Sequence, residues 1–93
     1  MANVLDTTLP GADLIETGLD DLARGIESVP SLLVSIGAPR LRRVGLAVPA
    51  VGADPERRLY DLLARDDPDT AHSRFNALVR RLVSFERAAE CVR

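Results

Sequence analysis

The C-terminal segment of the chain, Pro68 to Arg93, reads PDTAHSRFNALVRRLVSFERAAECVR and has the most regular pattern in the sequence. Seven apolar residues follow one another in alternating steps of four and three, the spacing of one helix face. They are Ala71, Phe75, Leu78, Leu82, Phe85, Ala89 and Val92, and we call them the C-terminal apolar face. Val79 and Val83 widen this face, as in a helix that packs within a bundle. We therefore predict one long amphipathic helix over 68–93 that packs against other helices.

Proline and glycine residues divide the rest of the chain into shorter segments. A first helix is predicted over 9–27, with Pro10 in its opening turn, where the missing N–H group does no harm. Its apolar residues recur at helical spacing and are Leu14, Ile15, Leu19, Leu22 and Ile26. Gly18 lies within this pattern and should weaken the helix by about 1 kcal/mol relative to alanine. We therefore expect another helix to approach closely at Gly18. Gly25 is either a second such site or the end of the helix, and we favour continuation to about Glu27.

Two further short helices are predicted in the middle of the chain. Ser28 is a suitable N-terminal cap, and Pro30 fits the first turn of the helix that follows it. The Gly-Ala-Pro sequence at 37–39 is a stop signal, so this buried helix is expected to end there. Another short helix is predicted over 39–44, followed by an extended connection over 46–53.

Aspartate followed by proline marks the start of the last two helices. Asp54 and Pro55 predict a helix that runs to about Arg65, and Asp67 and Pro68 repeat the signal directly afterwards. The fold class that follows is all-α: a small helical domain of four or five helices with a long C-terminal amphipathic helix. We assign residues 1–93 to a single domain and expect residues 1–8 to be disordered.

The composition limits the size of the core and the cellular setting. A chain of 93 residues with 46% hydrophobic but only 3% aromatic residues builds a thin core, and such domains often gain stability from a second subunit. The single cysteine, Cys91, excludes a disulfide within the chain. The sequence has no run of about 20 apolar residues, and residues 1–10 lack the pattern of a signal peptide. We expect a cytoplasmic protein that does not bind a membrane.

Residues that perform chemistry are scarce in this sequence. His72 and Cys91, the only histidine and the only cysteine, lie 19 residues apart on one predicted helix, which separates them by about 29 Å. They can supply neither a Cys-His pair within one subunit nor the three or four ligands of a zinc site. We interpret the acidic cluster Asp66, Asp67 and Asp69 as helix-capping and solvated carboxylates. The prediction is a protein that is not an enzyme and that has no catalytic residue, cofactor or metal.

The best candidate site for an external ligand is a group of arginines. The chain has no lysine, so arginine carries every positive side-chain charge. Arg40, Arg42 and Arg43 follow the predicted turn at 37–39, and arginines beside a helix N-terminus bind phosphates well. The stretch from Leu32 to Leu46 loosely resembles the helix-hairpin-helix DNA-binding element, in which a glycine-containing turn presents N–H groups to the phosphate backbone. Pro39 departs from that pattern because it takes the place of a second glycine and removes a donor. The competing interpretation is a solvated basic turn that pairs with the acidic first helix.

Two functional hypotheses follow from these patterns. The first is a non-enzymatic protein–protein interaction module that binds a protein partner or forms a homo-oligomer. Its interface would lie on the C-terminal helix and consist of Phe75, Leu78, Leu82, Phe85, Ala89 and Val92. The alternative is a small nucleic-acid-binding or regulatory protein that acts through Arg40, Arg42 and Arg43.

Overall fold

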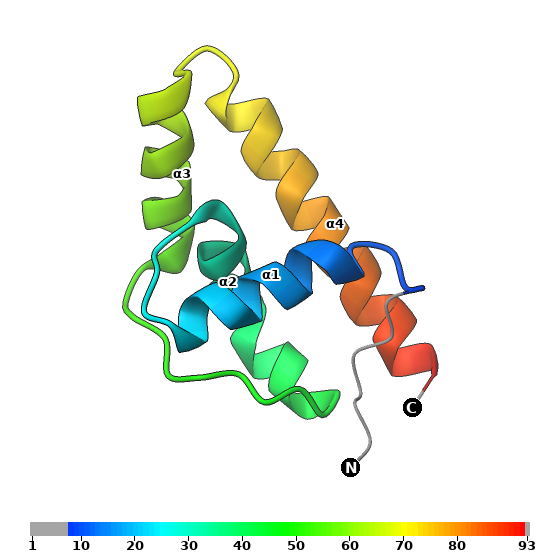
Figure 1. Ribbon diagram of the computed structural model, residues 1–93. Coiled ribbons are helices and arrows are strands. Elements are labelled where there is room, and N and C mark those ends of the chain that lie inside the picture. Colours follow the sequence, from blue (N-terminus) through cyan, green and yellow to red (C-terminus); the bar gives the residue numbers. More distant parts are fainter. Residues whose placement is uncertain (1–7, 93) are drawn as a thin grey trace.

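The computed structural model describes residues 8–92, which form four α-helices and no strand (Figure 1). The helices are α1 (Ala12–Ala23), α2 (Val29–Arg43), α3 (Pro55–Asp66) and α4 (Ala71–Cys91). With 21 residues, α4 is the longest and extends over about 32 Å. The predicted all-α class and the long C-terminal helix are confirmed, although this helix begins at Ala71 and not at Pro68. The expected disorder of residues 1–8 falls, apart from Thr8, outside the described residues.

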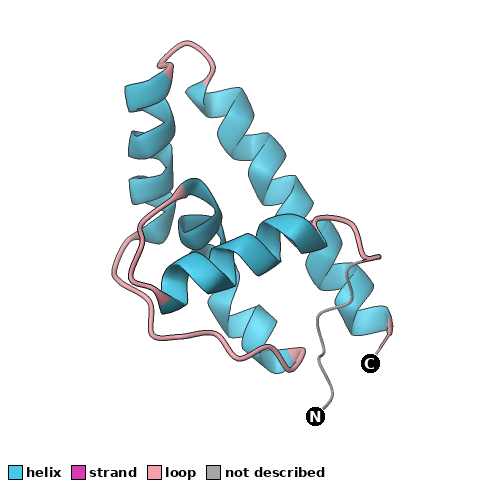
Figure 2. Cartoon of the chain, viewed as in Figure 1, coloured by secondary structure: helices cyan, strands magenta, loops and turns pink. Residues whose placement is uncertain are grey.

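Helix α2 is the centre of the fold because it packs against each of the other three helices. Helices α3 and α4 also pack against each other and converge at the 67–70 loop (Figure 1). The irregular connection between α2 and α3 returns alongside the C-terminal end of α1 (Figure 2). All four helices contribute fully buried side chains to one core, among them Ile15, Leu33, Leu41, Leu59, Leu63 and Phe85.

Helix α1 is shorter at both ends than the predicted span of 9–27. Gly11 precedes its first residue in a left-handed conformation, so Pro10 lies outside the helix. The helix ends at Ala23, and Gly25, which follows the C-cap residue Arg24, has a φ of +74°, a conformation that favours glycine. The N–H of Gly25 donates to the carbonyl of Leu22 and that of Ile26 donates to the carbonyl of Asp21, the pattern of a Schellman cap. Gly25 is therefore a stop signal and not an interior residue.

Helix α2 continues through 37–39, so the predicted stop at this point and the separate short helix over 39–44 are both wrong. Pro39 lies inside the helix and gives up one hydrogen bond, because it has no N–H group. Packing compensates for this loss, since Val34, Ala38 and Leu41 around it are fully buried. The helix ends only at Arg43, and Gly45, which follows the C-cap residue Val44, has a φ of +101°. The layout of the helix-hairpin-helix element is therefore absent, because its glycine turn is a stretch of helix.

The predicted capping residues act differently at the different helix starts. Ser28 caps α2 as expected, and it does so reciprocally with Ser31. Asp54 precedes α3 but its side chain makes no capping hydrogen bond, and its φ of +52° is left-handed. Asp67 accepts a hydrogen bond from the N–H of Asp69 at 3.1 Å, a local turn that precedes α4. The interpretation of the acidic cluster as a side-chain cap of α4 is therefore wrong.

Candidate interaction surface

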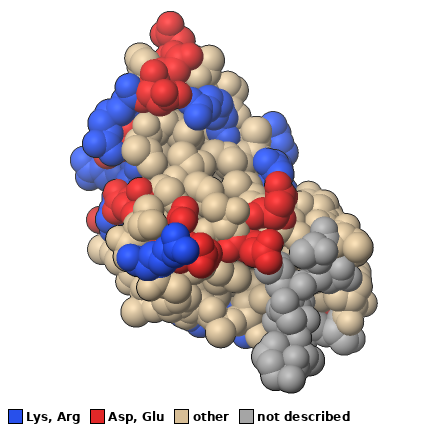
Figure 3. All heavy atoms as spheres, viewed as in Figure 1, with Lys and Arg blue, Asp and Glu red and all other residues tan. Residues whose placement is uncertain are grey.

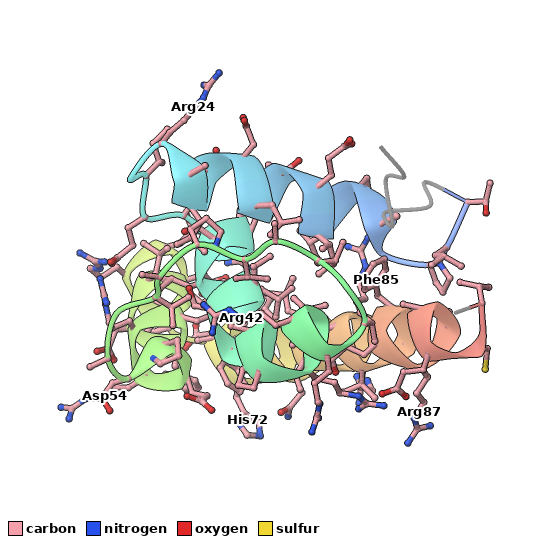
Figure 4. All side chains as sticks on the ribbon, turned by 90° about the horizontal axis from the view of Figure 1, so that it is seen from below. Arg24, Arg42, Asp54, His72, Phe85 and Arg87 are labelled. Carbon is pink, nitrogen blue, oxygen red and sulfur yellow. The ribbon has the colours of Figure 1, made fainter. Side chains whose placement is uncertain are left out.

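The C-terminal apolar face is covered mainly by the chain itself. Ala71, Leu82, Phe85 and Ala89 are buried, whereas Phe75 and Leu78 are half-buried and Val92 is 61% exposed. The side chain of Phe85 lies between α4 and α1 (Figure 4). A partner cannot reach the buried members of this face while the domain is folded. Any interface on α4 must therefore use the residues at the edges of this face.

The three arginines of α2 do not converge on one external site. Arg40 donates two hydrogen bonds to the carboxylate of Glu90, at 2.9 and 2.8 Å, and its Nη1 lies 3.5 Å from Glu86 Oε1. Arg42 donates instead to the backbone carbonyls of the following connection, at Val48 and Pro49. Two of the three guanidinium groups therefore hold the fold together. The acidic partner of Arg40 is α4 and not the acidic first helix that the sequence suggested.

Glu86 is a buried carboxylate that the sequence analysis did not single out. It is 4% exposed and packs against Gly37, where an added Cβ atom would approach Glu86 Oε2 to 2.8 Å. Burial raises the pKa of Glu86 above its ordinary value, and the charge of Arg40 opposes this shift. The hydrogen bond with Glu90 raises the pKa of Arg40, so this guanidinium stays charged. No sequence pattern marks Glu86, because its burial depends on the missing side chain of Gly37 on another helix.

We expect Glu86→Gln to raise the free energy of unfolding by about 1 kcal/mol at pH 7, because the buried charge disappears while the hydrogen bonds between Arg40 and Glu90 remain. The folded-state pKa of Glu86 lies above the unfolded value of 4.5, so the folded protein binds the proton more tightly. The stability of the wild type therefore rises relative to the variant as the pH falls from 7 toward 4.5. Urea unfolding at several pH values measures this difference.

Glu90→Gln is the matched control for this prediction. Its side chain is 44% exposed and accepts both hydrogen bonds from Arg40, so its loss should lower stability at pH 7. A loss of stability in Glu86→Gln equal to that in Glu90→Gln would show that Glu86 acts as a stabilising ion-pair partner and not as a strained buried charge.

Helices α2 and α4 enclose a shallow groove on the face opposite α1, with a volume of about 290 Å³. Its apolar floor and walls consist of Ile36, Pro39, Val79, Leu82 and Val83, and we call this site the α2–α4 groove. Ile36, Val79 and Val83 are half-buried, and Pro39 is exposed. The groove is at the small end of ligand pockets, which measure about 300–1,000 Å³. It suits a few side chains of a docked segment better than a whole cofactor.

Arginines border this groove on both sides. Arg43 lines it from α2, and Arg87 lies one helical turn beyond Val83 on α4 and points away from the body of the molecule (Figure 4). Within residues 8–92, Arg43 and Arg87 make no ion pair within 4 Å, whereas Arg40 pairs with the two nearby glutamates, Glu86 and Glu90. The rim of the groove is therefore positively charged.

The opposite face differs in charge. Acidic side chains form a band across the part of the surface that α1 covers (Figure 3), and Asp13, Glu16 and Asp20 are its exposed members on α1. A second apolar hollow of about 260 Å³ lies beside it, lined by Val29, Ala77 and Leu78 between two arginines. These arginines are already paired, Arg74 with Asp66 at 2.8 Å and Arg81 with Asp13 at 3.6 Å. This hollow therefore lacks the unpaired charge of the α2–α4 groove.

The residues that sequence analysis considered for catalysis lie apart. His72 is exposed in the first turn of α4, where its ring is 3.2 Å from the side-chain amide of Asn76. Cys91 is exposed at the other end of the same helix.

None of the described helices is both long enough and apolar enough to cross a bilayer.

No protein-family model, curated protein or solved structure matches this chain.

Proposed function

We propose that this chain is a non-enzymatic protein–protein interaction module that binds a segment of another protein in the α2–α4 groove. The observation that carries the proposal is the largely apolar groove between these two helices, whose lining includes Arg43, an arginine without an ion pair within 4 Å among the described residues. The apolar side chains at its edges are partly covered by the fold, so a docked segment would complete their burial. Burial of apolar surface contributes about 25 cal/mol per Å² to such an association.

The charge of the rim favours a different protein over a second copy of the chain. A two-fold dimer places the same patch of both subunits against each other. Pairing through the α2–α4 groove would bring Arg43 and Arg87 toward the same arginines of the other copy, and like charges across an interface oppose association. The homo-oligomer expected from the sequence therefore becomes the competing outcome of the test below.

Nucleic-acid binding through the arginines of α2 finds less support. Of the three candidate residues, only Arg43 keeps its guanidinium free of an internal hydrogen bond or ion pair among the described residues. A phosphate backbone is bound by several cationic groups that act together. The cytoplasmic location stays a prediction from the sequence.

Site-specific photo-crosslinking tests the proposed function. We expect a benzophenone amino acid at Pro39 or Val83, the two sides of the α2–α4 groove, to give a discrete covalent adduct with one identified protein in cells. Val83→Asp should reduce the adduct from position 39 by about tenfold, because an unpaired charge would enter an apolar contact. Mass spectrometry identifies the adduct, and circular dichroism verifies that each variant is folded.

Thr17 on α1 and Ser73 on α4 are the control positions, since both are exposed and neither lines the groove. Equal crosslinking from these positions, or an adduct that Val83→Asp leaves unchanged, would refute the proposal. An adduct with twice the mass of the chain would identify a second copy as the partner and would replace the heterologous binding proposed here.

A further inference from the structure

The two walls of the α2–α4 groove carry the same order of residue types. On α2 the outward-facing residues are Ile36, Pro39 and Arg43, and on α4 they are Val79, Val83 and Arg87. Each row therefore has two apolar residues and then an arginine, in steps of three or four residues that keep one helix face. Two parallel rows with this spacing are the surface that an amphipathic helix contacts.

The two helices run in the same direction along the groove. Gly37 of α2 faces Leu82 of α4, and Arg40, which lies further along α2, reaches Glu86 and Glu90 further along α4. Both rows therefore end in arginine at the same end of the groove. The result is a groove that is apolar over most of its length and basic at one end.

The basic end is only partly neutralised by the fold, since Arg43 interacts electrostatically with Glu86, which lines the same groove. The nearest carboxylates belong to Glu86, which is buried, and Glu90, which holds Arg40 through two hydrogen bonds. Arg43 and Arg87 make no ion pair within 4 Å among the described residues. A docked segment with carboxylates at this end would pair with both, and guanidinium groups bind carboxylates with well-matched geometry.

From these observations we infer that the partner segment is an acidic amphipathic helix, with its apolar face on Ile36, Val79 and Val83 and its carboxylates at Arg43 and Arg87. The inference rests on the proposed function, because it specifies what occupies the α2–α4 groove. A basic helix would meet two unpaired arginines, so the groove selects its partner by charge as well as by apolar contact.

Two synthetic helical peptides test this inference as probes, with the same apolar residues at i, i+4 and i+7 and either glutamate or lysine at the flanking positions. We expect the glutamate peptide to bind the full chain at least tenfold more tightly by fluorescence anisotropy. The preference should weaken as salt is added, because the pairs are at the rim. A double variant, Arg43→Gln with Arg87→Glu, should bind the glutamate peptide about tenfold more weakly. Its affinity for the lysine peptide should not fall.

Arg57→Glu is the matched control, because Arg57 is exposed on α3, makes no ion pair within 4 Å among residues 8–92 and does not line the groove. Equal binding of the two peptides, binding of neither, or a preference that survives the double variant would overturn the acidic-helix inference. The photo-crosslinking result does not depend on these peptides. A groove-specific adduct with a neutral or basic segment would therefore refute the inference while the interaction function stands.

Discussion

Phe85→Ala is expected to lower the free energy of unfolding by about 4 kcal/mol, because truncation of a buried aromatic side chain removes apolar contacts and leaves a cavity. Phe85 is fully buried and heads the largest buried side chains of the chain. A domain of 93 residues has a total stability of about 5–14 kcal/mol, so the variant should be close to unfolding. Urea denaturation followed by circular dichroism measures the loss.

Val92→Ala is the control, since Val92 belongs to the same predicted apolar face but is 61% exposed. We expect it to change stability by less than about 0.5 kcal/mol. The loss in Phe85→Ala should also be the same at low and high protein concentration, because the side chain is covered by its own chain. A loss that appears only at concentrations where subunits associate would mean that a second subunit covers Phe85.

This contrast shows what the periodicity of α4 predicts and what it leaves open. The steps of four and three residues identify the buried face correctly, since Ala71, Leu82, Phe85 and Ala89 are all buried. The periodicity indicates which face of a helix is buried. It does not indicate which other part of the chain, or which partner, packs on that face. Here α2 and α3 supply most of the helix packing on α4. The association that the sequence attributed to this face is proposed instead for the neighbouring Val79 and Val83.

The glycines show why helix boundaries were harder to predict than helices. Gly25 ends α1 because its φ is positive, whereas Gly37 lies inside α2 because its missing side chain makes room for Glu86 and Leu82. Both uses of glycine look the same in the sequence. Only tertiary packing separates them, and the same packing keeps Pro39 inside a helix that local signals would end.

The candidate site was only partly predictable for the same reason. Arg43 was among the predicted binding residues, but the sequence could not show that Arg40 and Arg42 are engaged within the fold. The α2–α4 groove joins residues that are more than 40 positions apart, such as Ile36 and Val79. With two helices of unknown relative placement, neither the groove nor the burial of Glu86 follows from spacing.

Gly18→Ala is expected to lower the free energy of unfolding by about 2 kcal/mol, although the same change in an exposed helix should raise it by about 1 kcal/mol. A Cβ atom at Gly18 would overlap the backbone carbonyl oxygen of Pro30 and would lie 2.5 Å from Cγ2 of Val34. Because the first of these is backbone at the start of α2, a rotamer change cannot relieve the overlap, and α1 must move away from α2. Thermal and urea unfolding measure the change.

Thr17→Ala is the control in the same helix. It should raise the free energy of unfolding, because Thr17 is exposed and alanine has the higher helix propensity. We expect a gain of about 0.5 kcal/mol there against the loss at Gly18. If both variants gain stability, α1 and α2 do not cross closely at Gly18. Since α2 also forms one wall of the groove, a displaced α2 in Gly18→Ala should weaken photo-crosslinking from position 39 as well. The close crossing of α1 and α2 at Gly18 thus helps to fix the position of the α2–α4 groove.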